Sequence, residues 1–258
     1  MSLPTYPEGH GLLKGRTVLV TAAAGTGIGY AAAKRCAEEG GRVVISDVHE
    51  RRLGEAAERL EEVCGERPAT VVCDVTDEAQ VVAMFAAAID AVGRVDVLVN
   101  NAGLGGYAPL VDMTDAQWDR VIDVSLTGTM RCTRAALRHM MPLGSGAIVN
   151  NASVLGWRAQ EGQSHYAAAK AGVMALTRCA ALEAASAGVR VNAVAPSLAM
   201  HAFLAKVTPP GLLEQLQQRE AFGRAAEPFE VANVIVFLAS DLSSYMTGEV
   251  VAVSSQHP

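Results

Sequence analysis

The 258-residue sequence lacks the features of nucleic-acid-binding, secreted and membrane proteins. Only 19% of its residues are charged, the formal net charge is −6, and no stretch is rich in Lys or Arg. The clustered basic surface that a phosphate backbone requires is therefore missing. No apolar run approaches the ~20 residues that span a bilayer, and residues 1–15 do not have the pattern of a signal peptide. These absences predict a cytoplasmic protein with no nucleic-acid or membrane partner.

Cysteine is also scarce. The five cysteines are an odd number, none forms a C-x-x-C pair, and each lies in or beside a segment expected to be helix or strand. This pattern favours reduced, packed thiols over a disulfide framework or a zinc site, and we expect no metal site. The five are Cys36, Cys64, Cys73, Cys132 and Cys179.

What the sequence does contain is an alternation of short apolar runs with amphipathic segments. Strands are expected at 17–21, 42–46, 70–73, 95–100, 147–151, 189–195 and 249–253, and helices at 30–39, 50–63, 77–92, 115–140, 164–187, 212–220 and 229–238. The strands are continuously apolar, which indicates that both faces of the sheet are covered.

The alternation predicts one α/β domain over residues 1–258, a doubly wound Rossmann-type fold whose seven-stranded parallel sheet has helices on both faces. A TIM barrel is the alternative, but a turn of the phosphate-binding type follows the first strand directly. Residues 197–225 are expected to form a lid over the substrate.

This first turn contains Gly25, Thr26, Gly27, Ile28 and Gly29. Small residues let the backbone approach a pyrophosphate, and the start of the next helix offers free N–H groups. Glycines after a strand are weak evidence alone, because any tight turn can use them. An acidic residue at the end of the second strand strengthens the prediction of a dinucleotide site.

That acidic residue is Asp47. Its carboxylate can accept the ribose hydroxyls of NAD and would repel the 2′-phosphate of NADP, although a helix-capping role is equally common for Asp in general. NAD is therefore the preferred cofactor. His49, Arg51 and Arg52 lie nearby and leave NADP possible.

A candidate catalytic group consists of Ser153, Tyr166 and Lys170. Tyr166 and Lys170 are four residues apart on one face of an expected helix, and Ser153 ends the preceding strand, at the edge where such folds bind ligands. A phenol has a pKa of about 10, and a nearby ammonium would favour the phenolate. Ser153 would hold a substrate oxygen against Tyr166.

With these motifs in place, the chain resembles a standard-length short-chain dehydrogenase/reductase over residues 15–253. The resemblance is carried by Gly25-Thr26-Gly27-Ile28-Gly29, Cys73-Asp74-Val75, Asn100-Asn101-Ala102-Gly103, Ser153, Tyr166-Ala-Ala-Ala-Lys170, Val191-Asn192-Ala-Val-Ala-Pro196 and Thr247-Gly248. It implies hydride transfer between a secondary alcohol or ketone and a nicotinamide cofactor. It also implies a homodimer or homotetramer formed through the helices at 115–140 and 164–187.

The resemblance assigns roles to individual residues. Tyr166 is the implied general acid/base, Lys170 lowers its pKa and binds the nicotinamide ribose, and Ser153 orients the substrate. Asp74 and Val75 would contact the adenine. The full set of implied cofactor-binding residues is Gly25, Thr26, Gly27, Ile28, Asp47, Asp74, Val75, Asn101, Ala102, Gly103, Tyr166, Lys170 and Pro196.

The sequence departs from the family pattern at several of these places. Ala23 stands where the family has the first glycine of the phosphate turn, and Ser125 stands where it usually has an Asn that holds a water behind the lysine. Ser125 is therefore counted as a fourth catalytic candidate, in the proton relay, with simple packing as the alternative. Ser197 and His201 replace the usual Gly and Thr after Pro196.

The expected mouth of the pocket carries apolar and basic side chains, which suit a bulky alicyclic or acyl group with an anionic handle. The candidate substrate residues are Leu104, Trp157, Arg158, His201 and Phe203. The chain looks most like an actinobacterial subgroup associated with breakdown of steroid C/D rings as CoA thioesters. The alternatives are a general 3-oxoacyl-thioester reductase and a non-catalytic dinucleotide-binding protein.

Overall fold

Seven parallel strands form one sheet in the computed structural model, which describes residues 3–200 and 211–255. Along the sheet the order is β3-β2-β1-β4-β5-β6-β7, and every neighbouring pair is parallel. The strands are β1 (Thr17–Thr21), β2 (Arg42–Asp47), β3 (Ala69–Val72), β4 (Val97–Asn100), β5 (Gly146–Asn151), β6 (Val189–Pro196) and β7 (Val250–Val253).

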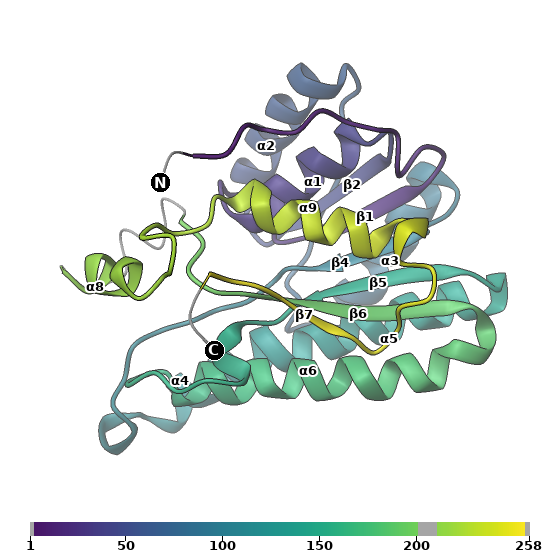
Figure 1. Ribbon diagram of the computed structural model, residues 1–258. Helices are drawn as coiled ribbons and strands as arrows, with labels where there is room; N and C mark the ends of the chain where they lie inside the picture. The colour runs from purple at the N-terminus through teal and green to yellow at the C-terminus, as the bar shows by residue number, and fades with distance from the viewer. Residues whose placement is uncertain (1–2, 201–210, 256–258) are drawn as a thin grey trace.

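Helices cover both faces of this sheet (Figure 1). On one face lie α1 (Ile28–Glu38), α2 (Glu50–Cys64) and α9 (Pro228–Ala239), and on the other lie α3 (Glu78–Val92), α5 (Gly128–Met140) and α6 (Ser164–Ala184). Two shorter helices, α4 (Asp115–Ile122) and α8 (Leu212–Gln218), lie toward the end of the molecule where the strands end. The predicted doubly wound fold is therefore confirmed, and the TIM barrel is excluded.

The pleat of β1 shows how the apolar runs build this three-layer arrangement. Successive side chains of a strand point to opposite faces. Val18 and Val20 pack into the core under α1 and α9, whereas Leu19 packs into the core under α3 and α5. All three side chains are completely buried. The continuous apolar run is therefore explained by helices that cover both faces of the sheet.

The order in which the chain adds strands to the sheet reverses between β1 and β4. From β1 it continues through β2 to β3 on one side, and β4 then begins the run toward β7 on the other. In doubly wound folds, ligands bind outside the carboxyl ends of the strands at such a switch point. The fold therefore places the candidate site beside the ends of β1 and β4.

The single helix predicted for 115–140 is wrong in one respect. A π-helical turn, Asp123–Thr127, separates α4 from α5. Gly128, the residue after this turn, packs closely against Val75 in the segment that follows β3. An added Cβ on Gly128 would be 2.7 Å from Val75 Cγ2. Single π turns inside helices often occur at functional sites, and this one contains Ser125.

The cysteine prediction is partly wrong. All five thiols are free, and Cys36, Cys73 and Cys132 are buried, but Cys64 and Cys179 are exposed rather than packed because they lie on outer helix surfaces. In the part of the chain that the structure describes, no cluster of three or more His, Cys, Asp or Glu could hold a metal. None of the helices described is long and apolar enough to cross a membrane.

Candidate active site

The turn after β1 forms a cradle at the start of α1. Gly27 caps this helix without a side-chain hydrogen bond, so N–H groups of the first helical turn have no side-chain acceptor there. Gly29 lies against the turn, and an added Cβ would be 2.4 Å from the carbonyl oxygen of Ala22. A helix N-terminus packed this closely against a turn of small residues fits the pyrophosphate of a dinucleotide.

Asp47 holds this turn from the end of β2. One carboxylate oxygen accepts the N–H of Ala24 at 3.1 Å and the other accepts the N–H of His49 at 3.0 Å. Burial raises the pKa of the Asp47 carboxyl, although the Ala24 N–H and Arg52 oppose this. Each oxygen retains acceptor capacity, so the residue fits a pair of ribose hydroxyls.

Asp74 and Val75 lie beside Asp47. The backbone N–H of Cys73 donates to the carbonyl of Asp47 at 3.0 Å, which holds the ends of β2 and β3 together. Asp74 accepts both the N–H and the hydroxyl of Thr76, at 2.9 and 2.7 Å, and Val75 is buried. The structure thus brings these two residues and Asp47 together at the carboxyl ends of β2 and β3.

Thr21, the last residue of β1, and Asn101, just after β4, join the phosphate turn to the next loop. The hydroxyl of Thr21 accepts the N–H groups of Asn101 and Ala102 at 3.0 and 3.1 Å, and the amide of Asn101 donates to the carbonyl of Ala22 at 3.1 Å. Gly103 follows, and a Cβ there would be 3.3 Å from Lys170 Nζ. The loop thus runs from the cofactor cradle to the catalytic candidates.

Ser153, Tyr166 and Lys170 are brought together as predicted by their spacing. Ser153 follows β5, and the other two lie in the first turns of α6. Ser153 and Tyr166 form a side-chain hydrogen bond. Lys170 is 3% exposed, and its Nζ donates to the carbonyl of Asn151 at 2.6 Å and lies 5.5 Å from the centre of the Tyr166 ring.

Electrostatics at this group differs from the expectation that Lys170 lowers the pKa of Tyr166. Burial raises the pKa of the Tyr166 phenol, and the hydrogen bond from Ser153 only opposes it. Burial also lowers the pKa of Lys170 to about 8. Without cofactor, desolvation thus dominates at both groups, because the ammonium is directed at a backbone carbonyl rather than at the phenol oxygen.

Ser125 lies completely buried next to this group. Its hydroxyl accepts the N–H of Leu104 at 2.9 Å and donates to the carbonyl of the same residue at 3.0 Å. Its own carbonyl accepts the hydroxyl of Thr129 at 2.9 Å. The side chain therefore closes a double hydrogen bond onto the loop after Gly103.

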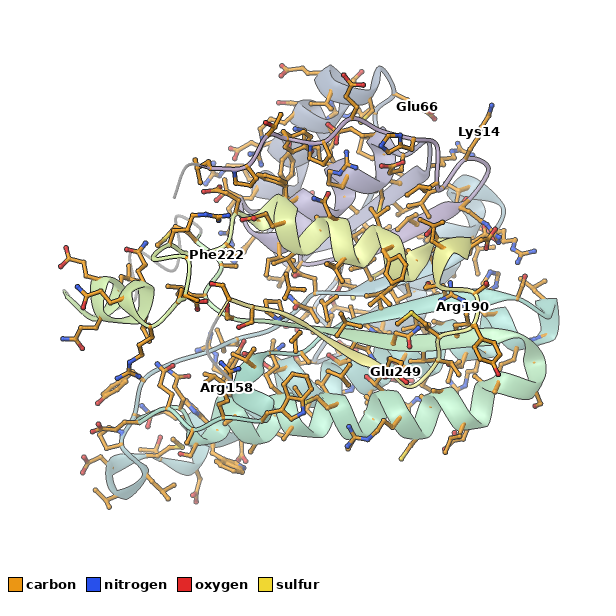
Figure 2. All side chains as sticks on the ribbon, in the orientation of Figure 1. Lys14, Glu66, Arg158, Arg190, Phe222 and Glu249 are labelled. Atoms are coloured by element: carbon orange, nitrogen blue, oxygen red, sulfur yellow. The ribbon has the colours of Figure 1, made fainter. Side chains whose placement is uncertain are left out.

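Of the candidate substrate residues, Leu104, Trp157 and Arg158 lie within the described part of the chain, and the structure places the neighbour of Leu104 beside Tyr166. Gly105, one residue after Leu104, comes so close to Tyr166 that an added Cβ would be 3.7 Å from its ring. Trp157 is 53% exposed, and Arg158 follows it at the carboxyl end of the sheet (Figure 2). His201 and Phe203 lie outside the described residues. Pro196 ends β6 and is buried.

Three residues that support the site were not singled out from the sequence. Arg59 of α2 donates to the carbonyl of Gly25 at 3.1 Å, Asn151 holds both Asn101 and Lys170, and the buried Glu220 accepts the hydroxyls of Ser197 and Ser255 at 3.2 and 2.9 Å. Only Asn151 had a signal in the sequence, since the run Val-Asn-Asn-Ala occurs at 99–102 and again at 149–152.

Comparisons with known proteins agree with this geometry. A family model described as Enoyl-(Acyl carrier protein) reductase matches residues 22–255. Over all of both proteins, the chain is 64% identical to "(5R,7aS)-5-hydroxy-7a-methyl-1-oxo-2,3,5,6,7,7a-hexahydro-1H-indene-carboxyl-CoA reductase" of Mycobacterium tuberculosis. It is 46% identical to "Cis-4-hydroxycyclohexanecarboxylate dehydrogenase" of Sinomonas cyclohexanicum, with 92% of this chain and 94% of that protein covered.

A solved structure gives the same result for the fold. The crystal structure of a short chain dehydrogenase from Mycobacterium smegmatis is 59% identical, covers 100% of this chain and 99% of that one, and superposes with a TM-score of 0.89. With the cofactor cradle and the Ser153, Tyr166 and Lys170 group in place, the chain belongs to the short-chain dehydrogenase/reductase family of NAD(P)-binding oxidoreductases.

Proposed function

We propose that this protein interconverts a secondary alcohol and a ketone on an alicyclic CoA thioester, with NAD as the cofactor. The observation that carries the proposal is the hydrogen-bonded pair Ser153 and Tyr166 beside the buried Lys170, next to a phosphate cradle. The reaction class follows from this group. The substrate class rests on the similarity to the indene-carboxyl-CoA reductase and the cyclohexanecarboxylate dehydrogenase.

Each residue of the group has a defined task in the proposed mechanism. A bound nicotinamide ring supplies or accepts the hydride at the carbinol carbon. Ser153 and Tyr166 donate hydrogen bonds to the ketone oxygen, and Tyr166 gives up its phenolic proton to that oxygen during reduction. Lys170 carries a positive charge that stabilises the phenolate left behind. In alcohol oxidation the same proton moves in reverse.

Ser125 is proposed to act on this mechanism through the loop that it holds. Its hydroxyl bonds both backbone groups of Leu104, and its carbonyl is bonded by Thr129, so a relay water would have to use the remaining acceptor capacity of these oxygens. The geometry therefore favours anchoring of the loop beside Lys170 over the predicted relay.

The preference for NAD is proposed from Asp47. A carboxylate with free acceptor capacity suits the two ribose hydroxyls, and a 2′-phosphate would face an unfavourable negative charge. Asp47→Ala is expected to weaken NAD use and to improve NADP use relative to it. The ratio of kcat/KM for the two cofactors measures this, and an unchanged ratio would rule out the ribose role.

The substrate proposal places the acyl group between Leu104, Trp157 and a lid at 197–225. The exposed indole and the apolar side chain suit a bicyclic carbon skeleton, and Arg158 would meet an anionic part of the CoA. Ser197, at the start of this segment, donates a hydrogen bond to Glu220, near its end, at 3.2 Å, which ties together the two described parts of the proposed lid.

Turnover with matched substrates tests this proposal. Nicotinamide absorbance is followed with a bicyclic ketone carried as its CoA thioester, the same ketone as a free acid, and a straight-chain 3-oxoacyl-CoA. The bicyclic thioester is expected to give the highest kcat/KM. A preference for the straight-chain substrate would favour a general 3-oxoacyl-thioester reductase, and NAD binding without any turnover would favour a non-catalytic protein.

We also propose that the protein is cytoplasmic and assembles as a homodimer or homotetramer. The outer face of α6 exposes Leu182 (82%), which suits the expected homodimer or homotetramer formed through α5 and α6. Five unpaired cysteines suit a reducing compartment such as the cytoplasm. Light scattering of the purified protein measures the assembly.

A further inference from the structure

Two neighbouring strands end in the same run of residues, Val-Asn-Asn-Ala, at 99–102 and 149–152. In the sheet, Asn100 of β4 lies directly beside Asn150 of β5. Asn100 donates to Asn150 at 2.8 Å, and Asn150 donates to Thr177 of α6 at 2.9 Å. This first pair is thus buried under α6 and is part of the core.

The second pair lies at the candidate active site. The amide of Asn151 donates to Asn101 Oδ1 at 2.9 Å, and the amide of Asn101 donates to the carbonyl of Ala22 at 3.1 Å. The carbonyl of Asn151 accepts Lys170 Nζ at 2.6 Å. A continuous chain of contacts therefore runs from the phosphate turn through two asparagines to the catalytic lysine.

The Ala22 carbonyl, at one end of this series of hydrogen bonds, determines the orientation of both side-chain amides. The carbonyl of Ala22 can only accept, so Asn101 must turn its NH₂ toward it and its oxygen toward Asn151. Asn151 must then present its own NH₂ to that oxygen. As a result, Asn151 Oδ1 is a buried acceptor with no partner in the region the structure describes, an arrangement that costs stability.

The phosphate turn, where this series of contacts begins, needs such support. Ala22 has φ of +52°, in the left-handed region that a residue with a Cβ adopts only at a cost in energy. Its carbonyl lies against Gly29, at the start of α1. Strained backbone of this kind persists only where surrounding contacts determine it, and the Asn101 amide is one such contact.

We propose that Asn151 is a positioning residue, which fixes Asn101 and thereby the phosphate turn through its side chain, while its carbonyl fixes Lys170. This inference rests on the proposed function, because it takes a nicotinamide dinucleotide as the ligand of the phosphate turn. Asn151 touches neither reacting atom and acts through its two neighbours.

The test uses Asn151→Leu, which keeps the number and branching of the side-chain heavy atoms and removes the amide, with Asn151→Ala as a smaller second variant. The readouts are the dissociation constant of NAD by calorimetry and the melting temperature without cofactor. Asn233→Ala is the matched control, because Asn233 is also partly buried and accepts from Arg35 Nε at 3.0 Å, far along the chain on α9. We expect the Asn151 variants to bind NAD about tenfold more weakly and the control to bind it as the original chain does.

A second comparison separates positioning from a general loss of stability. If Asn151 acts through Asn101, the double variant Asn101→Ala/Asn151→Leu binds NAD no more weakly than the weaker of the two single variants. Independent, multiplying losses would overturn the proposal, as would Asn151 variants whose NAD affinity matches that of Asn233→Ala. If the original chain itself fails to bind NAD, the proposed function fails instead.

Discussion

At the scale of single residues, Lys170 carries its charge where water cannot solvate it. Burial lowers its pKa to about 8, against about 10.4 for an exposed lysine. The unfolded chain therefore holds this proton more tightly than the folded one. Below pH about 8 the buried ammonium destabilises the cofactor-free fold, and this cost is relieved as the pH rises from about 8 toward 10.4. The fold thus retains a destabilising group that its chemistry requires.

This pKa predicts the pH dependence of ketone reduction. Reduction requires protonated Tyr166, whose pKa is raised, and charged Lys170, so kcat/KM for the reduced cofactor should be level below pH about 8 and fall above it, by about tenfold per pH unit. Steady-state rates at saturating ketone measure this. Lys170→Met is the control, which should be slower at all pH values and lack the fall. A profile that stays level to pH 10 would contradict the assignment.

At the scale of elements, two helical glycines, Gly29 in the first turn of α1 and Gly54 in α2, differ in their surroundings. Gly29 lies where a Cβ would be 2.4 Å from both Ala22 O and Asn101 Nδ2, whereas Gly54 in the middle of α2 has open space around it. The same change to alanine therefore has opposite consequences at the two positions.

Gly29→Ala is expected to displace the phosphate turn and weaken NAD binding by at least about tenfold, with a lower melting temperature. Gly54→Ala should leave NAD binding unchanged and stabilise the protein by about 0.5–1 kcal/mol, because alanine favours the helix. Calorimetry and thermal unfolding of both variants check this. Equal NAD affinity for the two would mean that the turn does not hold the cofactor.

The π-helical turn between α4 and α5 predicts a second effect. Ser125→Ala removes both hydrogen bonds to Leu104 in a fully buried position, which should destabilise the protein by about 1–3 kcal/mol. Activity should fall together with the order of the loop. Urea unfolding and kcat provide the two measurements. A variant of unchanged stability with a large loss of kcat would restore the predicted proton-relay role.

At the scale of the whole molecule, the N-terminal segment is tied to the face of the sheet covered by α1 and α9. Glu39 accepts the N–H groups of His10 and Leu12 and pairs with the buried Arg35, which also bonds Asn233 of α9. Burial alone would raise the pKa of the Glu39 carboxyl, but the two N–H donors and Arg35 outweigh it and lower the pKa.

A lowered carboxyl pKa contributes stability above the unfolded value of about 4.3 and loses it as the pH falls toward the folded value. Glu39→Gln should therefore destabilise the protein at pH 7 by about 1–3 kcal/mol, since the buried Arg35 loses one of its two carboxylate partners and keeps Glu38. The difference from the original chain should shrink in acid. Urea unfolding at neutral and acidic pH measures it, and a difference that grows in acid would be the opposite of this expectation.

How much of the molecule the sequence predicts depends on whether a feature is local. Val18, Leu19 and Val20 form a continuous apolar run, and such runs gave the sheet with both faces covered. The Tyr166 to Lys170 spacing gave the catalytic face of α6 in the same way. Both features need only a few neighbouring residues.

Features that need distant contacts were not predicted. Ser125, within the π turn, bonds Leu104, which lies 21 residues away in the sequence, and Asn151 after β5 bonds Asn101 after β4. The pKa of Tyr166 was expected to fall, because the spacing says nothing of the carbonyl that takes up Lys170. Sequence patterns give the residues of a site, and packing decides their electrostatics.

We propose that Tyr166 transfers the proton in an oxidoreductase reaction at this site. Tyr166→Phe keeps the ring and removes only the hydroxyl, so its turnover of a bicyclic ketone carried as a CoA thioester, followed by nicotinamide absorbance, tests the claim most directly. We expect kcat to fall by at least about 100-fold while NAD still binds. A variant that retains the full rate would contradict it.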